Sequence, residues 1–129
     1  MEYATSTESR ELQQLCDTIR TLLPEGEYKK CEELIAEAMG KYPDAAQPHN
    51  LFGLLLEREG DHASAMKHFR AARALDPTYQ PARQNLEHYG TFYSSGTVAY
   101  DESDCRQNKQ REVQVVYDAQ GVGHVEWKS

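Results

Sequence analysis

Residues 51–77 read LFGLLLEREGDHASAMKHFRAARALDP, which is an apolar helical run, a turn, a second helical run and a stop. Gly60 marks the turn and Pro77 the stop, and 34 positions earlier Gly26 and Pro43 mark the same two places. The same offset joins Leu22 to Leu56, Cys31 to Ala65, Ile35 to Phe69 and Ala38 to Ala72. A fixed period of this length is typical of stacked helical hairpins. Such arrays build concave surfaces that bind other chains.

Helical spacing of the apolar residues, together with the positions of Pro and Gly, predicts a mainly α protein. Thr5 and Glu8 have the spacing of a capping box, so the first helix should begin near Thr5 and end before Pro24. Further helices are expected at about 27–41, 46–59, 62–75 and 81–89. The helix at 46–59 is apolar nearly all round, which indicates that neighbouring helices cover it on more than one side.

The composition changes after Gly90, so residues 91–129 are interpreted as a C-terminal extension. Residues 97–100 could form a short strand, and residues 101–112 are polar enough for a loop or connector. Two β-prone runs around a turn predict a β-hairpin over 113–127. A lone hairpin is marginal in water. It should therefore cover the open end of the helical array, pair with residues 97–100, or pair with another chain.

Both repeats carry small, bulky and aromatic residues at matching places. Residues 46–79 carry Phe52, Gly53, Leu56, Gly60, Ala65, Phe69, Ala72 and Pro77. Residues 12–45 carry Leu15, Leu22, Gly26, Tyr28, Cys31, Ile35, Ala38 and Pro43, with Ile19 where a small residue would be usual. These patterns resemble tetratricopeptide repeats. The resemblance implies antiparallel helical hairpins in an α–α superhelix, with a capping helix at 80–90 and one repeat domain over 1–90. Gly53 and Ala65 would be small because two helices approach closely there, and Phe69 would fill the space between the hairpins.

The resemblance also implies a binding groove lined by the first helix of each hairpin. Its residues would be Gln13, Cys16, Arg20, Leu23, Gln47, Asn50, Leu54, Glu57, Gln84 and His88. Some members of the family bind a terminal carboxylate with lysine, asparagine and arginine side chains. In this chain Cys16, Arg20, Leu51, Pro81 and Asn85 stand at those positions. We therefore expect an extended or helical protein segment as the ligand, and not a tail that ends in a carboxylate.

The charge of the chain narrows the classes of partner. It has 21 Asp and Glu against 14 Lys and Arg, a net charge of −7. This balance argues against binding to nucleic acid and against docking on anionic membranes. No apolar run has the length of a membrane span, and the first residues lack the pattern of a signal peptide. Three cysteines are a sparse, odd count, which favours a reducing cytoplasmic location.

The sequence shows no pattern of catalytic or metal-binding chemistry. Cys31 should be a buried packing residue, whereas Cys16 is expected to face the groove and Cys105 to be accessible beside Arg106. No Cys-x-x-Cys, no His-Glu-x-x-His, no phosphate-binding loop and no nucleophile elbow is present. We therefore predict a protein that is not an enzyme and needs no metal or cofactor.

Three functions are compatible with these patterns. The first is a non-catalytic protein–protein interaction module that binds a protein or peptide segment in the concave groove. The second is a small acidic chaperone of the secretion or assembly type. The third is a homodimeric scaffold assembled through the C-terminal hairpin.

Overall fold

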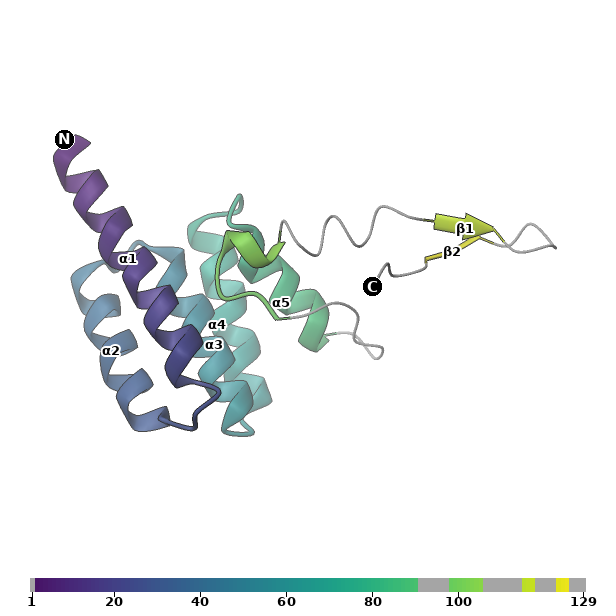
Figure 1. Ribbon diagram of the computed structural model, residues 1–129, viewed down its shortest axis with the longest axis horizontal. Helices are drawn as coiled ribbons and strands as arrows, with labels where there is room; N and C mark the ends of the chain where they lie inside the picture. Colours follow the sequence, from purple (N-terminus) through teal and green to yellow (C-terminus); the bar gives the residue numbers. More distant parts are fainter. Residues whose placement is uncertain (1, 91–97, 106–114, 118–122, 126–129) are drawn as a thin grey trace.

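The computed structural model describes the backbone of residues 2–90, 98–105, 115–117 and 123–125, and the side chains of residues 7–90 and 98–105. The described part is mainly helical (Figure 1). Its long helices are α1 (Glu2–Leu22), α2 (Tyr28–Lys41), α3 (Ala46–Arg58), α4 (His62–Leu75) and α5 (Gln80–Gly90). Residues 102–105 add one helical turn.

Helix α4 has its predicted bounds, and the predicted ends of α2, α3 and α5 lie within one residue of those observed. Helix α1 differs because it begins at Glu2. The prediction that the capping box at Thr5 and Glu8 starts this helix is therefore wrong, since Thr5 lies inside it. No Gly or Pro interrupts the sequence before Pro24, so nothing in the backbone stops the helix from extending outward.

The first helix of each hairpin ends in the same backbone geometry. Gly26 has φ +82° and Gly60 has φ +87°, in the left-handed region that favours glycine. In each turn the glycine N–H donates to the carbonyl three residues back, and the next N–H donates to the carbonyl five residues back. This pair of hydrogen bonds is the Schellman closure of a helix. The period of 34 residues is therefore present in the backbone hydrogen bonds.

The second helix of each hairpin ends alike as well. The N–H groups of Tyr42 and Asp76, 34 positions apart, each donate to the carbonyl four residues back. Pro43 and Pro77 follow directly. A proline there cannot donate the next helical hydrogen bond, so the chain leaves the helix at the same point of both repeats.

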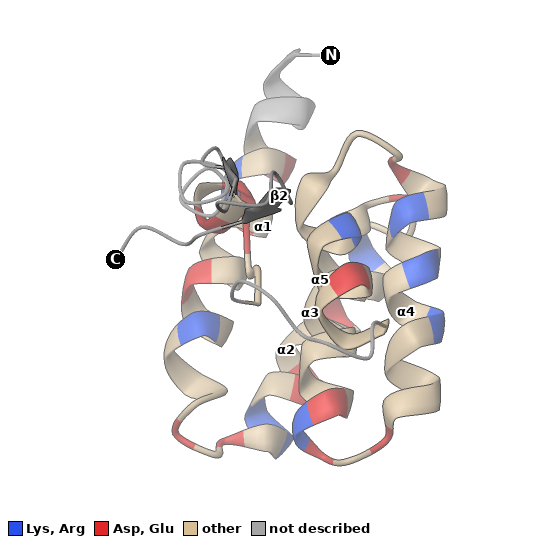
Figure 2. Ribbon diagram, turned by 90° about the vertical axis from the view of Figure 1, so that its right-hand side faces the viewer, with Lys and Arg blue, Asp and Glu red and all other residues tan. Residues whose placement is uncertain are grey.

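The helices pack as two layers (Figures 1 and 2). Helix α3 contacts α1 and α5, and these three form one layer. Helices α2 and α4 form the other layer, where α2 contacts α1 and α3, and α4 contacts α3 and α5. The prediction that neighbours cover α3 on more than one side is confirmed, because α3 contacts all four of the other long helices.

Helices α3 and α4 approach each other closely at Gly53. Gly53 sits so near the Phe69 ring that a Cβ built on the glycine would lie 2.4 Å from Cε1. Phe69 and Ala65 are fully buried, and Ile35 and Leu51 belong to the same core cluster. The prediction of a small residue at Gly53, where two helices approach closely, is confirmed, whereas a close approach at Ala65 stays a prediction.

Two short strands, β1 (Val115–Tyr117) and β2 (Gly123–Val125), pair antiparallel with Val116 opposite His124. The rest of the predicted hairpin, including its turn and Trp127, lies outside the described residues. Residues 98–100 were predicted as a strand and form none. Residues 101–105, predicted as part of a loop or connector, pack on the helices, and residues 106–112 lie outside the described part.

The contact between Gly53 and Phe69 makes a testable prediction about stability. The Gly53→Ala substitution adds a methyl group where the ring leaves no room, so it should lower the free energy of unfolding by about 1–3 kcal/mol. Gly40 is the matched control, because it is also a helical glycine but has nothing within 4 Å of its would-be Cβ. Gly40→Ala should raise stability by up to about 1 kcal/mol through helix propensity. Urea unfolding of the two variants measures both changes, and equal stability would contradict the close approach.

Candidate functional site

The layer formed by α1, α3 and α5 holds a segment of the same chain. Residues 98–105, light green in Figure 1, lie against this layer. Helix α1 reaches the segment with Gln13 and Arg20, α3 with Asn50 and α5 with Asn85. The helices that were predicted to line a groove therefore bind a short stretch of polypeptide between them.

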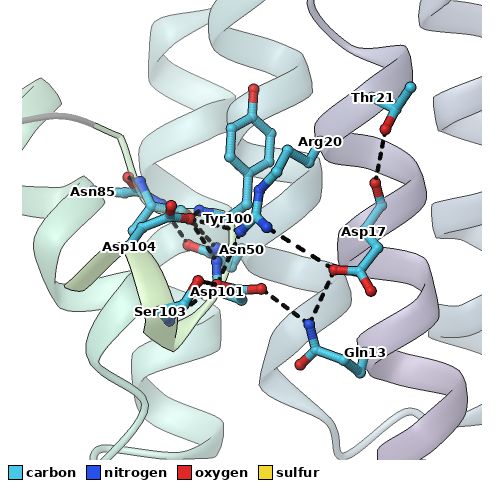
Figure 3. A network of polar contacts seen from close by, with 11 residues as sticks. Gln13, Asp17, Arg20, Thr21, Asn50, Asn85, Tyr100, Asp101, Ser103 and Asp104 are labelled. Carbon is cyan, nitrogen blue, oxygen red and sulfur yellow. Dashed lines mark hydrogen bonds and ion pairs between the residues drawn. The ribbon is translucent and has the colours of Figure 1, made fainter. Parts of the chain in front are cut away.

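Two asparagines bind the backbone of one residue in the segment, Ala99 (Figure 3). The Asn85 amide accepts from the Ala99 N–H at 2.8 Å and donates to the Ala99 carbonyl at 2.7 Å. Asn50 donates to the same carbonyl at 3.0 Å, and its own oxygen accepts from Asn85 at 2.8 Å. Asn85 thus offers Ala99 the donor and acceptor that a neighbouring β-strand would offer.

These contacts are shielded from solvent. Asn50, Asn85 and Ala99 are each 0% exposed. A buried amide without partners costs roughly 1–3 kcal/mol, so each of these groups needs the others to be satisfied. The small Ala99 side chain is itself enclosed, which means that this position admits only a small residue. We call Asn50 and Asn85 the asparagine clamp.

Charged groups bind the segment next to the clamp. Arg20 Nη2 lies 2.9 Å from Asp101 Oδ1 and 2.9 Å from Asp104 Oδ2. Gln13 Nε2 donates to Asp101 Oδ2 at 2.9 Å. The Arg20 guanidinium also lies 5.5 Å from the centre of the Tyr100 ring. Gln13 and Arg20 are seven positions apart, which is two helical turns, so both point from the same side of α1.

The two aspartates also shape the segment locally. Asp104 Oδ2 accepts from the N–H groups of Tyr100 and Asp101 at 2.9 and 3.2 Å. Asp101 Oδ1 accepts from the Ser103 N–H at 3.0 Å. Such Asp-to-backbone bonds stabilise a tight turn. The turn brings both carboxylates onto Arg20, which one extended strand could not do with residues three positions apart.

The electrostatics of Asp101 follow from this arrangement. Its burial alone would raise the pKa of the carboxyl group. Hydrogen bonds from Ser103, Gln13 and Arg20 outweigh burial and lower the pKa of Asp101 to about 2. Burial would in turn lower the pKa of Arg20, but Asp101 and Asp104 together raise it. The ion pair between Arg20 and Asp101 therefore stays charged through the neutral pH range.

A hollow of about 610 Å³ remains beside the bound segment. Gln13, Arg20 and Gln47 line it from the helices, and Glu102 and Ser103 line it from the segment. Its floor includes the buried thiol of Cys16 and the ring of Tyr79. Burial, reinforced by the charge of Asp101, raises the pKa of Cys16 to about 12, so the thiol is protonated at neutral pH. The pKa of Tyr79 is also raised, chiefly by burial.

The structure gathers some of the predicted groove residues and separates others. Gln13, Cys16, Arg20 and Gln47 line the hollow, and Asn50 reaches the segment. The prediction that Cys16 is exposed is wrong, because it is 1% exposed on the inward side of α1.

The remaining predicted residues lie elsewhere. Leu23 and Leu54 belong to the buried core cluster on which Val98 and Tyr100 pack, so they line no open surface. Glu57 pairs with His62 at 2.6 Å. Gln84 and His88 are half-buried on α5.

Sequence reasoning did not select Asn85, Asp101 or Asp104 as site residues. It also predicted an accessible Cys105, which is wrong because this residue is buried at 5% exposure. One signal was present in the sequence. Asn85 lies three positions after Ala82, on the apolar stripe of its helix, where a polar side chain requires a buried partner.

A pair of histidines lies between α3 and α4. His49 Nδ1 and His68 Nδ1 are 3.2 Å apart, and Phe52 packs on the His68 ring. Burial lowers the pKa of both imidazoles. No group of three or more His, Cys, Asp or Glu side chains in the described ranges could hold a metal ion. Within those ranges, too, no helix has the length and apolarity to cross a membrane.

No protein-family model, curated protein or solved structure matches this chain. The function proposed below rests on contacts within the chain.

The low pKa of Asp101 predicts how stability depends on pH. A carboxyl group whose pKa is lower in the folded state stabilises the fold above its unfolded pKa of about 3.9, and this contribution is lost as the pH falls toward 2. Asp101→Asn should therefore reduce the free energy of unfolding at pH 7 by about 2 kcal/mol more than it does near pH 2. Asp44→Asn, at an exposed turn residue, controls for the loss of one negative charge. Urea unfolding at several pH values tests this, and a constant difference from pH 7 to pH 2 would contradict it.

Proposed function

We propose that the protein is a non-catalytic protein–protein interaction module. Its binding surface is the layer of α1, α3 and α5, and its ligand is a peptide segment of a protein partner. The 34-residue helical repeat supports this proposal, because repeats of this kind present concave surfaces to other chains. The resemblance to tetratricopeptide repeats points to the same class.

One observation carries the proposal: this layer holds residues 98–105 by the chemistry that a peptide ligand requires. The asparagine clamp pairs with the backbone N–H and carbonyl of Ala99, which every non-proline residue presents. Arg20 and Gln13 add contacts to carboxylates. Main-chain hydrogen bonds supply affinity and side-chain contacts supply selectivity in peptide recognition.

The groups at this face favour binding over catalysis. Amide and guanidinium side chains hold their partners without exchanging protons at neutral pH. The potential nucleophile at the site, Cys16, has its pKa raised to about 12 by burial and by the charge of Asp101. A thiol in that state reacts poorly, because the thiolate is the nucleophile. We also propose a cytoplasmic location, where the buried thiols of Cys16 and Cys31 would stay reduced.

The chaperone and the homodimeric scaffold remain alternative proposals. Nothing in the contacts described above favours either over the interaction module. A chaperone would have to keep an aggregation-prone client soluble on co-expression. A scaffold would have to be dimeric in solution through residues 113–127.

Site-specific photo-crosslinking tests the proposed surface. Gln47 lines the hollow and can be replaced, Gln47→benzoylphenylalanine, without removing any of the contacts that hold residues 98–105. Illumination in a lysate of the native source should then give a discrete heavier product. The control is Glu33→benzoylphenylalanine on the exposed side of α2. No product from Gln47, or the same products from both positions, would contradict the proposal.

A further inference from the structure

The contacts at Ala99 recognise the backbone of that residue and the small size of its side chain. The asparagine clamp makes three hydrogen bonds to Ala99, all of them to its N–H and carbonyl groups. The side chain of Ala99 is enclosed, so the residue at this position must also be small. Any protein segment with a small residue at this point can make the same contacts, so the clamp alone does not favour the chain's own segment.

The contacts further along recognise two carboxylates. Asp101 and Asp104 lie two and five positions after Ala99, and both reach Arg20. Glu102 between them is exposed, which leaves that position unrestricted. A segment with a basic or apolar residue in place of Asp101 would leave Arg20 without its buried partner. The face therefore selects an acidic sequence with the spacing of Ala99, Asp101 and Asp104.

Two observations indicate that this segment can leave the face. Arg20 is 36% exposed and Asp104 is 21% exposed, so water reaches the ion pairs and can replace them. The hollow of about 610 Å³ shows that residues 98–105 fill only part of the face. An incoming chain would have space beside the segment before displacing it.

We propose that residues 98–105 are an internal ligand that occupies the layer of α1, α3 and α5 until an acidic segment of a partner protein, folded into the same turn, displaces it. The partner segment carries a small residue followed, two and five positions later, by Asp or Glu. This inference rests on the proposed function and names the ligand class of the same site. Because the internal segment is tethered, its effective concentration is on the order of millimolar, which lowers the apparent affinity for every outside ligand. Acidic peptides that bind weakly therefore do not displace the internal segment.

A labelled peptide with the sequence of residues 98–105 tests the proposal by fluorescence anisotropy under reducing conditions. The proteins are the full chain and its Asp101→Asn/Asp104→Asn variant, in which the internal segment is weakened but Arg20, Gln13 and the clamp are kept. The peptide should bind the variant at least roughly ten-fold more tightly than the unaltered chain. A second peptide with the same two Asn substitutions should bind neither. Equal binding of the first peptide to both proteins, equal binding of both peptides, or no binding at all would overturn the proposal.

Circular dichroism shows whether the double variant folds. If it does not fold, a second measurement tests the proposal. Unlabelled peptide at millimolar concentration is added to the unaltered, nitrogen-15-labelled chain. Amide hydrogen exchange at Ala99 and Tyr100 should become at least several-fold faster as the internal segment is displaced, and unchanged exchange would overturn the proposal. Sedimentation should show a monomer. A dimer that the peptide dissociates would identify a second copy as the occupant and overturn the choice of a partner.

The two proposals fail separately. A partner that crosslinks from Gln47 while the peptide binds neither protein would retain the interaction module and remove the internal ligand. Binding of the peptide with no crosslinked partner would show that residues 98–105 can be displaced, and would remove the interaction module together with the partner segment.

Discussion

The layer of α1, α3 and α5 depends on one interaction, which is the set of hydrogen bonds between the asparagine clamp and Ala99. Asn50 and Asn85 place amide groups on α3 and α5 where they are fully shielded from solvent, so each amide needs a partner within the protein. The backbone of Ala99 satisfies them, and they satisfy the backbone of Ala99 in return. Either side alone would carry the cost of unpaired buried groups. The helical layer and the 98–105 segment therefore stabilise each other.

The ion pairs around Arg20 have a different role. They lie nearer the solvent, where exposure weakens each pair. The ion pairs set the register of the 98–105 segment. One guanidinium binds two carboxylates three positions apart, and this fixes which residue of the segment reaches the clamp. In a chain of net charge −7, the positive charge of Arg20 beside Asp101 and Asp104 favours an acidic segment at this position.

The sequence predicted the helices well because their signals are local. Gly26 and Gly60 require a left-handed backbone, Pro43 and Pro77 stop a helix, and both effects act over a few residues. The docking of residues 98–105 was not predicted, because polar residues in a polar stretch give no hydropathy signal. Only the apolar stripe around Asn85 hinted that a partner was needed. Of the predicted groove residues, Arg20 and Asn50 contact residues 98–105 in the structure, whereas Asp101 and Asp104 had been assigned to a connector. Long-range polar contacts of this kind depend on the folded geometry of both sides.

The matching helix ends at Tyr42 and Asp76 bear on how such a protein can evolve. The repeats 12–45 and 46–79 end with the same backbone hydrogen bonds, so the end of the second repeat is a suitable start for a further one. A tandem duplication of residues 46–79 could join without a new kind of turn, and would add one more inner helix carrying a Gln47 and an Asn50. The layer of α1, α3 and α5 would lengthen in whole units, and under the proposed function a longer ligand would fit without redesigning the contacts already in place.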